Sequence, residues 1–254
     1  MTDTVLWHIE VSHYNEKARW ALDYKQVPHR RKAPLPGATG LWSAVLTRGK
    51  SRRVPLLRLD GRIVHDSTAI IAALEERHPD PPLYPSDPDE RARALELEDF
   101  FDEHQAPAMR SFMFAYTLPH PDGLVDALLP NAPSARRTML RRATPLVRPA
   151  VRADLRASLA TVDEKRAKVI AAMDRLESEL GDGDYLVGDS FGVADLTAAA
   201  LFTPLLAPAE RPYLPRVHAP EILEFRAELE ARPGGRWIHD MYRRHRGTSA
   251  EVGR

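Results

Sequence analysis

Short apolar runs alternate with amphipathic stretches over about the first eighty residues of the chain. Short apolar runs indicate strands, and apolar side chains three or four positions apart indicate helices. An Asp-Gly pair between two such runs indicates a hairpin turn. We expect strands at 5–9, 29–33, 54–59 and 62–65, helices at 13–24 and 66–78, and either a short helix or a loop at 41–46. This order predicts a small α/β layer.

Beyond this layer, prolines interrupt the chain and helical periodicity then takes over. Prolines at 79, 81, 82, 85 and 88 cannot continue a helix or a central strand, because proline fixes φ and lacks an N–H donor. The predicted fold class is therefore an α/β domain followed by an all-α helical bundle. We place the first domain at 1–79, the linker at 80–88, the all-α domain at 89–246 and a disordered tail at 247–254.

Two segments of the all-α half differ from simple helix connections. The proline-rich stretch at 116–133 is long enough to form a flap or lid. The following stretch, 134–160, carries seven arginines and a single acid, Asp154. Such a run usually forms a solvated face, and the alternative is that it attracts an anionic ligand or partner.

Ser12 lies where the first predicted strand gives way to the first predicted helix. The N–H groups at a helix N-terminus lack partners and favour a negative charge, so a serine there can help to hold an anion or a thiolate. The alternative is that Ser12 only caps the helix, which serine does well. Both roles use the same turn.

The composition narrows the chemistry, because 254 residues include no cysteine and balance 36 basic with 36 acidic residues. Any thiol must come from a ligand. A net charge of zero gives no general attraction to nucleic acid or to a membrane, and the histidines have no metal-ligand spacing. We expect no metal, no nucleic-acid partner and no membrane partner. Without a long apolar run or a secretory signal, we expect a cytoplasmic protein.

Four motifs, together with this order of elements, resemble the cytosolic glutathione S-transferase family. The first lies at 12–19 (Ser-His-Tyr-Asn-Glu-Lys-Ala-Arg) and is similar to the turn of the serine-type classes. It has His13 where proline is usual and Asn15 where serine or cysteine is common. The resemblance implies that Ser12 is catalytic and stabilises the thiolate by donating a hydrogen bond. We expect Arg19 on the helix surface or in a supporting position.

The second and third motifs resemble the family's glutathione-binding segments. Residues 53–56 (Arg-Val-Pro-Leu) are similar to a segment with a cis proline whose backbone pairs with the cysteinyl part of glutathione. Residues 66–70 (Asp-Ser-Thr-Ala-Ile) are similar to the acid and serine that hold its γ-glutamyl end. The alternatives are a plain proline at the start of a strand and a plain helix cap. The resemblance implies that glutathione is bound by His13, Arg53, Val54, Pro55, Asp66 and Ser67.

The fourth motif lies at 188–196 (Gly-Asp-Ser-Phe-Gly-Val-Ala-Asp-Leu) and resembles the family's cap of a buried helix. Gly192 replaces the capping serine or threonine, so we expect Asp195 to accept a hydrogen bond from the Gly192 N–H alone, in a structural role. The family's fold is a thioredoxin-like N-terminal domain followed by an all-α bundle. The resemblance implies the same fold here.

The resemblance also implies an activity, in which a glutathione S-transferase-like enzyme directs bound glutathione at a small hydrophobic electrophile. Three alternatives stay open: a thiol-dependent isomerase, an enzyme using another low-molecular-weight thiol, and a non-catalytic binding or interaction protein. A homodimer is implied by the family. One face of the first long helix of the second domain either borders the electrophile or forms core; it carries Phe101, Met109, Phe112 and Met113.

Overall fold

The computed structural model describes residues 3–34, 39–129 and 132–253. Residues 1–2, 35–38, 130–131 and 254 lie outside the described part, and with them parts of the first predicted domain, of the stretch at 116–133 and of the predicted tail. The first half holds β1 (Val5–Trp7), α1 (His13–Tyr24), β2 (Arg30–Lys32), α2 (Thr39–Leu46), β3 (Leu56–Leu59), β4 (Arg62–His65) and α3 (Ser67–Arg77). The helical half holds α4 (Pro88–Phe100), the π-helix η1 (Phe101–Gln105), α5 (Ala106–Thr117), α6 (Gly123–Leu128), α7 (Ser134–Asp154), the 3-10 helix η2 (Leu159–Thr161), α8 (Val162–Leu180), α9 (Val193–Leu206), α10 (Pro220–Glu230) and α11 (Pro233–His245).

The strands form one four-stranded sheet in the order β2-β1-β3-β4. β1 is parallel to β2 and antiparallel to β3, with Leu6 opposite Leu57. The predicted hairpin is present, because β3 and β4 pair antiparallel and the turn residues Asp60 and Gly61 both have positive φ. The sheet and its helices confirm the thioredoxin-like first domain, and the second half is helical as predicted.

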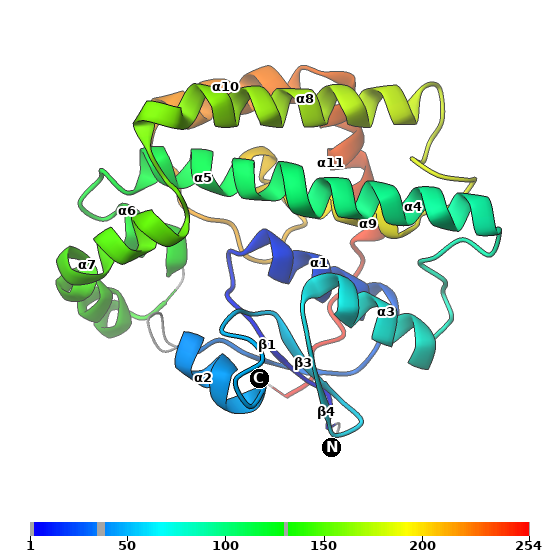
Figure 1. Ribbon diagram of the computed structural model, residues 1–254, viewed down its shortest axis with the longest axis horizontal. Coiled ribbons are helices and arrows are strands. Elements are labelled where there is room, and N and C mark those ends of the chain that lie inside the picture. Colours follow the sequence, from blue (N-terminus) through cyan, green and yellow to red (C-terminus); the bar gives the residue numbers. More distant parts are fainter. Residues whose placement is uncertain (1–2, 35–38, 130–131, 254) are drawn as a thin grey trace.

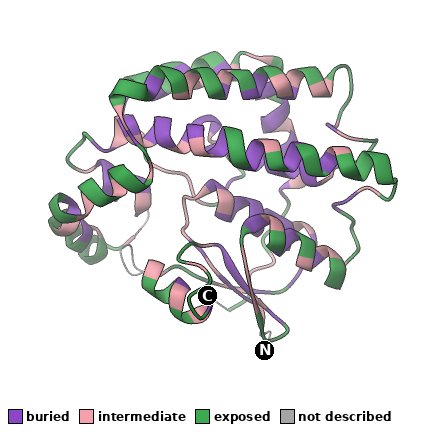
Figure 2. Cartoon of the chain, viewed as in Figure 1, coloured by how far each residue is buried: buried purple, intermediate pink, exposed green. Residues whose placement is uncertain are grey.

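Helix α1 lies between the sheet and the helical half, as Figure 1 shows. It packs against α3 on its own side and against α9 on the other. Figure 2 shows its surface almost wholly buried. Arg19, which we expected on the surface or in a supporting position, has no exposed surface. Of the two positions expected, the surface one is excluded because the helical half covers that face of α1, although arginine usually faces water.

Helix α9 is buried along its whole length and forms the centre of the helical half. Its N-terminus is held by Asp195, which accepts hydrogen bonds from the N–H of Gly192 and from the N–H of Leu186, both at 2.8 Å. The prediction that Gly192 is the only donor was therefore wrong. The Leu186 N–H comes from a preceding loop that only the tertiary fold brings to this carboxylate.

The stretch expected to form a flap or lid contains α6, and α6 packs with α7 around a small separate core. That core consists of Leu118, Leu124, Val125, Leu129, Leu140 and Ala157. Helix α7 is continuous although it contains Pro145 and Pro149. Two of its arginines pair with acids of the preceding segment, Arg137 with Asp126 and Arg141 with Asp122.

The described part of the tail, which we expected to be disordered, makes hydrogen bonds to the first domain. The N–H of Val252 donates to the carbonyl of His29 at 2.8 Å, and the N–H of Ala250 donates to Asp23 Oδ1 at 2.9 Å. These bonds place the tail beside the start of β2 and the end of α1. Exposed strand edges pair readily with an extended segment, which a composition-based prediction of disorder does not take into account.

None of the described helices is both long enough and apolar enough to cross a membrane.

Candidate active site

A cavity of about 540 Å³ opens between the sheet domain and the helical half. Its walls come from the turn before α1, the segment before β3, the start of α3, and α5 and α7. All of the predicted site residues line it, namely Ser12, His13, Arg53, Val54, Pro55, Asp66 and Ser67. The fold therefore brings together positions that are far apart in the sequence.

Ser12 is the N-cap of α1, with extended backbone angles of −70° and 130°. Its Oγ accepts two hydrogen bonds from Asn15, one from the backbone N–H at 3.4 Å and one from the side-chain Nδ2 at 2.7 Å. A serine hydroxyl has one hydrogen to donate. Because both bonds use the oxygen as an acceptor, the hydroxyl hydrogen is left for a group in the cavity.

Asn15 is a site residue that sequence reasoning missed, since it was noted only as a departure from the family pattern. It is buried, and its Oδ1 accepts from the N–H of Ile9 at 3.1 Å. Its Nδ2 lies within 3.4 Å of the carbonyl of Val54 as well as close to Ser12. One amide therefore ties the Ser12 turn to the segment before β3.

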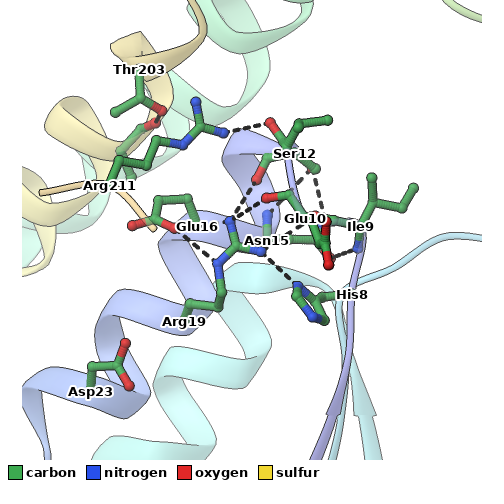
Figure 3. A network of polar contacts seen from close by, with 12 residues as sticks. His8, Ile9, Glu10, Ser12, Asn15, Glu16, Arg19, Asp23, Thr203 and Arg211 are labelled. Carbon is green, nitrogen blue, oxygen red and sulfur yellow. Dashed lines mark hydrogen bonds and ion pairs between the residues drawn. The ribbon is translucent and has the colours of Figure 1, made fainter. Parts of the chain in front are cut away.

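Two buried arginines donate hydrogen bonds to the backbone carbonyls of the same turn (Figure 3). Arg19 donates to the carbonyls of residues 9, 10 and 12 at 3.3, 2.8 and 3.4 Å. Arg211, from the segment after α9, donates to the carbonyl of Val11. Four successive carbonyls are thus satisfied by two guanidinium groups, which fixes the turn and adds positive charge beside it. No sequence signal identified Arg211, which lies about two hundred residues away.

A buried ion cluster continues from Arg19 toward the far end of α1. Glu16 pairs with Arg19 at 2.9 Å and with Arg246 at 2.7 Å. Asp23 pairs with Arg246 at 2.8 Å and with Arg31 at 2.7 Å. Burial alone raises the pKa of Glu16, but the positive charges of Arg246 and Arg19 outweigh it and lower the pKa to about 2.

A second buried cluster lies beneath the start of α3. Lys17 Nζ lies 2.5 Å from Asp102 Oδ2 and 2.8 Å from Glu98 Oε1. It also donates to Thr68 Oγ1 at 2.9 Å, and Thr68 follows Ser67 directly. Burial lowers the pKa of Lys17, whereas the two carboxylates raise it above its ordinary value. Lys17 therefore links α1, α3 and the junction of α4 with η1.

The start of α3 and the segment before β3 offer polar groups to the cavity. Asp66 has a φ of 78° and caps α3 through Oδ1, which accepts from the N–H of Thr68 at 2.9 Å. Ser67 is buried at the cavity wall. The Val54–Pro55 bond is cis, and the exposed Arg53 lies 3.9 Å from Asp154 across the cavity. Backbone strain at a residue such as Asp66 is often found at functional sites.

His13 and Tyr14 complete the turn and line the cavity. Burial, together with the charges of Arg110 and Arg211, holds the pKa of His13 well below its usual value, so its ring is neutral. The ring centroids of His13 and Tyr14 are 4.6 Å apart. The Tyr14 hydroxyl donates to the carbonyl of Asp102 at 2.8 Å, and burial raises the pKa of Tyr14.

The helical wall of the cavity is largely apolar. Phe101, Met109 and Phe112 are core residues that do not line it, so only part of the face noted in the sequence borders the cavity. Met113 does line it. The other helical residues of the wall include Pro107, Arg110, Phe114, Leu128, Val151 and Leu155. Within the described residues, no group of three or more His, Asp or Glu side chains is placed to hold a metal ion.

Comparison with known proteins places both halves of the chain. The model of "Glutathione S-transferase, N-terminal domain" matches residues 6–82, and the model of "Glutathione S-transferase, C-terminal domain" matches residues 138–233. A possible glutathione S-transferase from Rhodopseudomonas palustris has a TM-score of 0.64 at 16% identity, covering 100% of both chains. A glutathione S-transferase from Methylobacterium radiotolerans in complex with glutathione sulfonate has a TM-score of 0.55 at 22% identity, covering 99% of this chain and 98% of that one.

Sequence relatives match over shorter segments. The chain is 33% identical to maleylacetoacetate isomerase of Dictyostelium discoideum over 97 residues, which is 37% of this chain and 44% of the relative. It is 52% identical to a probable maleylacetoacetate isomerase of Caenorhabditis elegans over 42 residues, 16% of this chain and 20% of the relative. The chain thus matches less than half the length of these relatives.

Proposed function

This chain belongs to the glutathione S-transferase family, and from that membership we propose that it is a glutathione-dependent enzyme in which Ser12 stabilises the thiolate. The observation that carries the proposal is the pair of hydrogen bonds from Asn15 to Ser12 Oγ. They leave the Ser12 hydroxyl to donate to a sulfur in the cavity. A hydrogen bond to the charged form lowers the thiol pKa, and each unit corresponds to about 1.4 kcal/mol.

The surroundings of Ser12 support the same role. The N-terminus of α1 favours a negative charge, and the guanidinium groups of Arg19 and Arg211 lie directly behind the turn. His13 is neutral and the Tyr14 hydroxyl is already donated to a carbonyl. Ser12 is therefore the hydroxyl of this turn that is available to the sulfur.

We propose that glutathione lies extended along the sheet side of the cavity. Its cysteinyl part pairs with the backbone of Val54, beside Pro55. Its γ-glutamyl end meets Ser67 and the N-terminus of α3 through its carboxylate, and Asp66 through its ammonium group. Its glycine carboxylate approaches Arg53. His13 borders the cysteinyl part as an uncharged ring.

The second substrate lies against the apolar helical wall, which suits a small electrophile with a hydrophobic body. In conjugation, the sulfur forms a bond to an electrophilic carbon while the leaving group departs with its electron pair. The proton released from the thiol passes to solvent. Ser12 acts throughout as a hydrogen-bond donor, because a serine hydroxyl is too weak a base to remove that proton.

A thiol-dependent isomerase is the second candidate, and the part-length similarity to maleylacetoacetate isomerases favours it. In that reaction the thiolate adds to a carbon–carbon double bond, rotation follows, and the sulfur is expelled again. No atoms are gained or lost overall. The same thiolate site serves both reactions, so the proposal for Ser12 is common to both.

Three further points remain proposals that follow from family membership. We place the division between the domains in the segment 80–88, which follows α3 and ends at the first residue of α4. We also propose a cytoplasmic location and a homodimer. Light scattering during size-exclusion chromatography tests the dimer, since a mass near one chain contradicts it.

The first experiment measures glutathione binding by calorimetry and the thiol pKa from the ultraviolet absorbance of the bound thiolate. In wild type we expect binding and a thiol pKa below that of free glutathione. In Ser12→Ala we expect the thiol pKa to rise by about one to two units and turnover to fall about a hundredfold, with the fold retained. Ser158→Ala is the matched control, because Ser158 caps η2 through its hydroxyl but does not line the cavity.

Two sets of assays, one with different electrophiles and one with different thiols, distinguish between the alternative functions. Aryl chlorides report conjugation, and a cis-unsaturated acid reports isomerisation without net consumption of glutathione. If another low-molecular-weight thiol binds where glutathione does not, the protein uses that thiol. If no thiol binds, the protein is a non-catalytic member of the family. If Ser12→Ala leaves both the thiol pKa and turnover unchanged, the role proposed for Ser12 is wrong.

A further inference from the structure

Arg110 is a half-buried cation on the helical wall of the cavity, and no described side chain neutralises it. It belongs to α5, and its guanidinium lies 5.9 Å from the centre of the Tyr14 ring. Its Nε is buried and has no hydrogen-bond partner. Among the described residues no carboxylate lies within ion-pair distance of it.

Two arginines of neighbouring elements have carboxylate partners, whereas the buried Arg211 donates to the carbonyl of Val11 instead. Arg19 pairs with Glu16, and Arg137 pairs with Asp126. Of the acids that the helical half contributes to the cavity wall, Asp154 faces Arg53 and Glu103 is exposed, and among the described residues neither forms an ion pair with Arg110. Burial lowers the pKa of Arg110, although a guanidinium remains charged at neutral pH. An unpaired cation in such a place is stabilised when an anion arrives.

The glutathione sites proposed above do not use Arg110. Asp66, Ser67 and Arg53 belong to the sheet domain, whereas Arg110 projects from the helical wall with apolar Met113 and Phe114 on the same helix. The groups around Arg110 thus combine a cation with an apolar surface. This combination suits a molecule that has both a hydrophobic body and a negative group.

We propose that the electrophile carries a carboxylate, and that Arg110 binds it while the apolar helical wall holds the rest of the molecule. This inference rests on the proposed function and adds the chemical class of the second substrate. Arg110 selects the substrate and places its reactive carbon beside the sulfur held at Ser12. A guanidinium binds a carboxylate through two parallel hydrogen bonds, which fixes orientation as well as charge. Arg216 lines the same cavity with an exposed side chain and adds positive charge at its rim.

The test compares two ligands of nearly the same shape, 1-naphthoate and the uncharged 1-naphthamide. Their dissociation constants are measured by calorimetry at low salt on the full chain saturated with glutathione. For wild type we expect naphthoate to bind about tenfold or more tightly than naphthamide, the range of a charge-assisted hydrogen bond. In Arg110→Gln we expect this preference to fall to about one, chiefly through weaker naphthoate binding.

Arg142→Gln is the matched control, since it removes the same charge from an exposed position on α7 that does not line the cavity. It should keep the preference for naphthoate. Circular dichroism and the dissociation constant of glutathione report whether each variant keeps its fold and its thiol site.

Equal binding of the two ligands to wild type overturns the inference, and so does a preference that survives in Arg110→Gln. A third result also overturns it: if Arg110→Gln raises the thiol pKa by about a unit and leaves the preference intact, Arg110 serves the sulfur instead. The proposed function is judged separately, by glutathione binding. If glutathione does not bind, the two ligands are compared on the free protein, where the role of Arg110 is still decided.

Discussion

The direction in which the Ser12 hydroxyl points depends on a single neighbouring side chain. Asn15 donates to Ser12 Oγ and approaches the carbonyl of Val54, while its own carbonyl accepts from Ile9. Buried amide groups need partners for all of their polar atoms, so this arrangement resists rotation of the side chain. Asn15 is therefore a positioning residue for the thiolate site.

Replacing Asn15 tests that role through the pKa of the bound thiol. We expect Asn15→Ala to raise it by up to about one unit, because the Ser12 hydroxyl is then free to turn toward other acceptors. Asn15→Asp keeps the shape but replaces the donor by an acceptor and adds negative charge, so the increase should be larger. The measurement is the pH dependence of thiolate absorbance at saturating glutathione. Equal values in wild type and both variants contradict the role.

Glu16 gives a prediction about stability and pH. Its pKa of about 2 in the folded protein lies below the ordinary value of 4.5. The folded state thus favours the ionised form, and the resulting stabilisation is complete above pH 4.5 and is lost as the pH falls toward 2. Glu16→Gln leaves Arg19 and Arg246 without their carboxylate, and we expect it to lower the free energy of unfolding by about 3 kcal/mol at pH 7.

Urea unfolding at several pH values checks this expectation. The difference between wild type and Glu16→Gln should narrow as the pH falls below 4.5, because the wild-type carboxyl also becomes neutral. The control is Glu210→Gln, an exposed position, where we expect a change within about 0.5 kcal/mol at every pH. A difference that stays constant down to pH 3 would falsify the assigned ion pairing.

Among the elements, α1 has the most demanding position, because it is covered by the sheet and α3 on one side and by α9 on the other. Its buried polar residues therefore need buried partners. Lys17 pairs with Asp102 in η1, and Arg19 donates to the carbonyl of Glu10 in the turn before the helix. The tail after α11 returns to the far end of α1 and satisfies Asp23. The tail thus contributes to the burial and hydrogen bonding of the C-terminal end of α1.

The tail gives a prediction at this scale, based on the hydrogen bond from the N–H of Val252 to the carbonyl of His29. Val252→Pro removes this donor, and we expect a loss of about 1 kcal/mol in the free energy of unfolding. Val252→Ala keeps the donor and is the control. Hydrogen exchange should become faster in the tail of the proline variant alone. Fast exchange of these amides in wild type would contradict the observed pairing.

For the whole molecule, the two halves share one hydrophobic core. Trp20 of α1 lies 4.2 Å from the ring of Tyr242 and donates to the carbonyl of His245 at 3.0 Å. Figure 1 shows the helical half resting on α1 and α3. If either half unfolds, the other half loses the burial of its apolar side chains in this core. We therefore expect the chain to unfold as a single cooperative unit.

Cooperativity predicts that tryptophan fluorescence and circular dichroism report the same unfolding transition. We expect one midpoint for both probes in urea, because unfolding of either half exposes the shared core. Glutathione at a hundred times its dissociation constant should add about 2.7 kcal/mol and shift both curves together. Trp20→Phe, which keeps a ring but loses the N–H donor, should lower the midpoint without separating the probes. Two separate transitions contradict the shared core.

The sequence was sufficient for the hairpin, the two-part architecture and the order of most elements, although it left α2 open and did not predict α6. Apolar periodicity, an Asp-Gly turn and a run of prolines are local signals, and local geometry follows from them. Short motifs also identified Ser12, Val54 and Asp66 as candidates, and these residues line one cavity in the structure. Their functional roles remain proposals.

Only the tertiary structure revealed the groups that surround and support Ser12. Arg19 was expected at the surface or in a supporting position, and its side chain is buried. Arg211 gave no sequence signal, yet its buried guanidinium donates to the carbonyl of Val11. The tail was expected to be disordered, yet its Ala250 N–H donates to Asp23. The physical reason is that the burial of a charged side chain depends on which distant segment covers it. Periodicity within a helix shows which residues share a face, but not whether a second domain lies on that face.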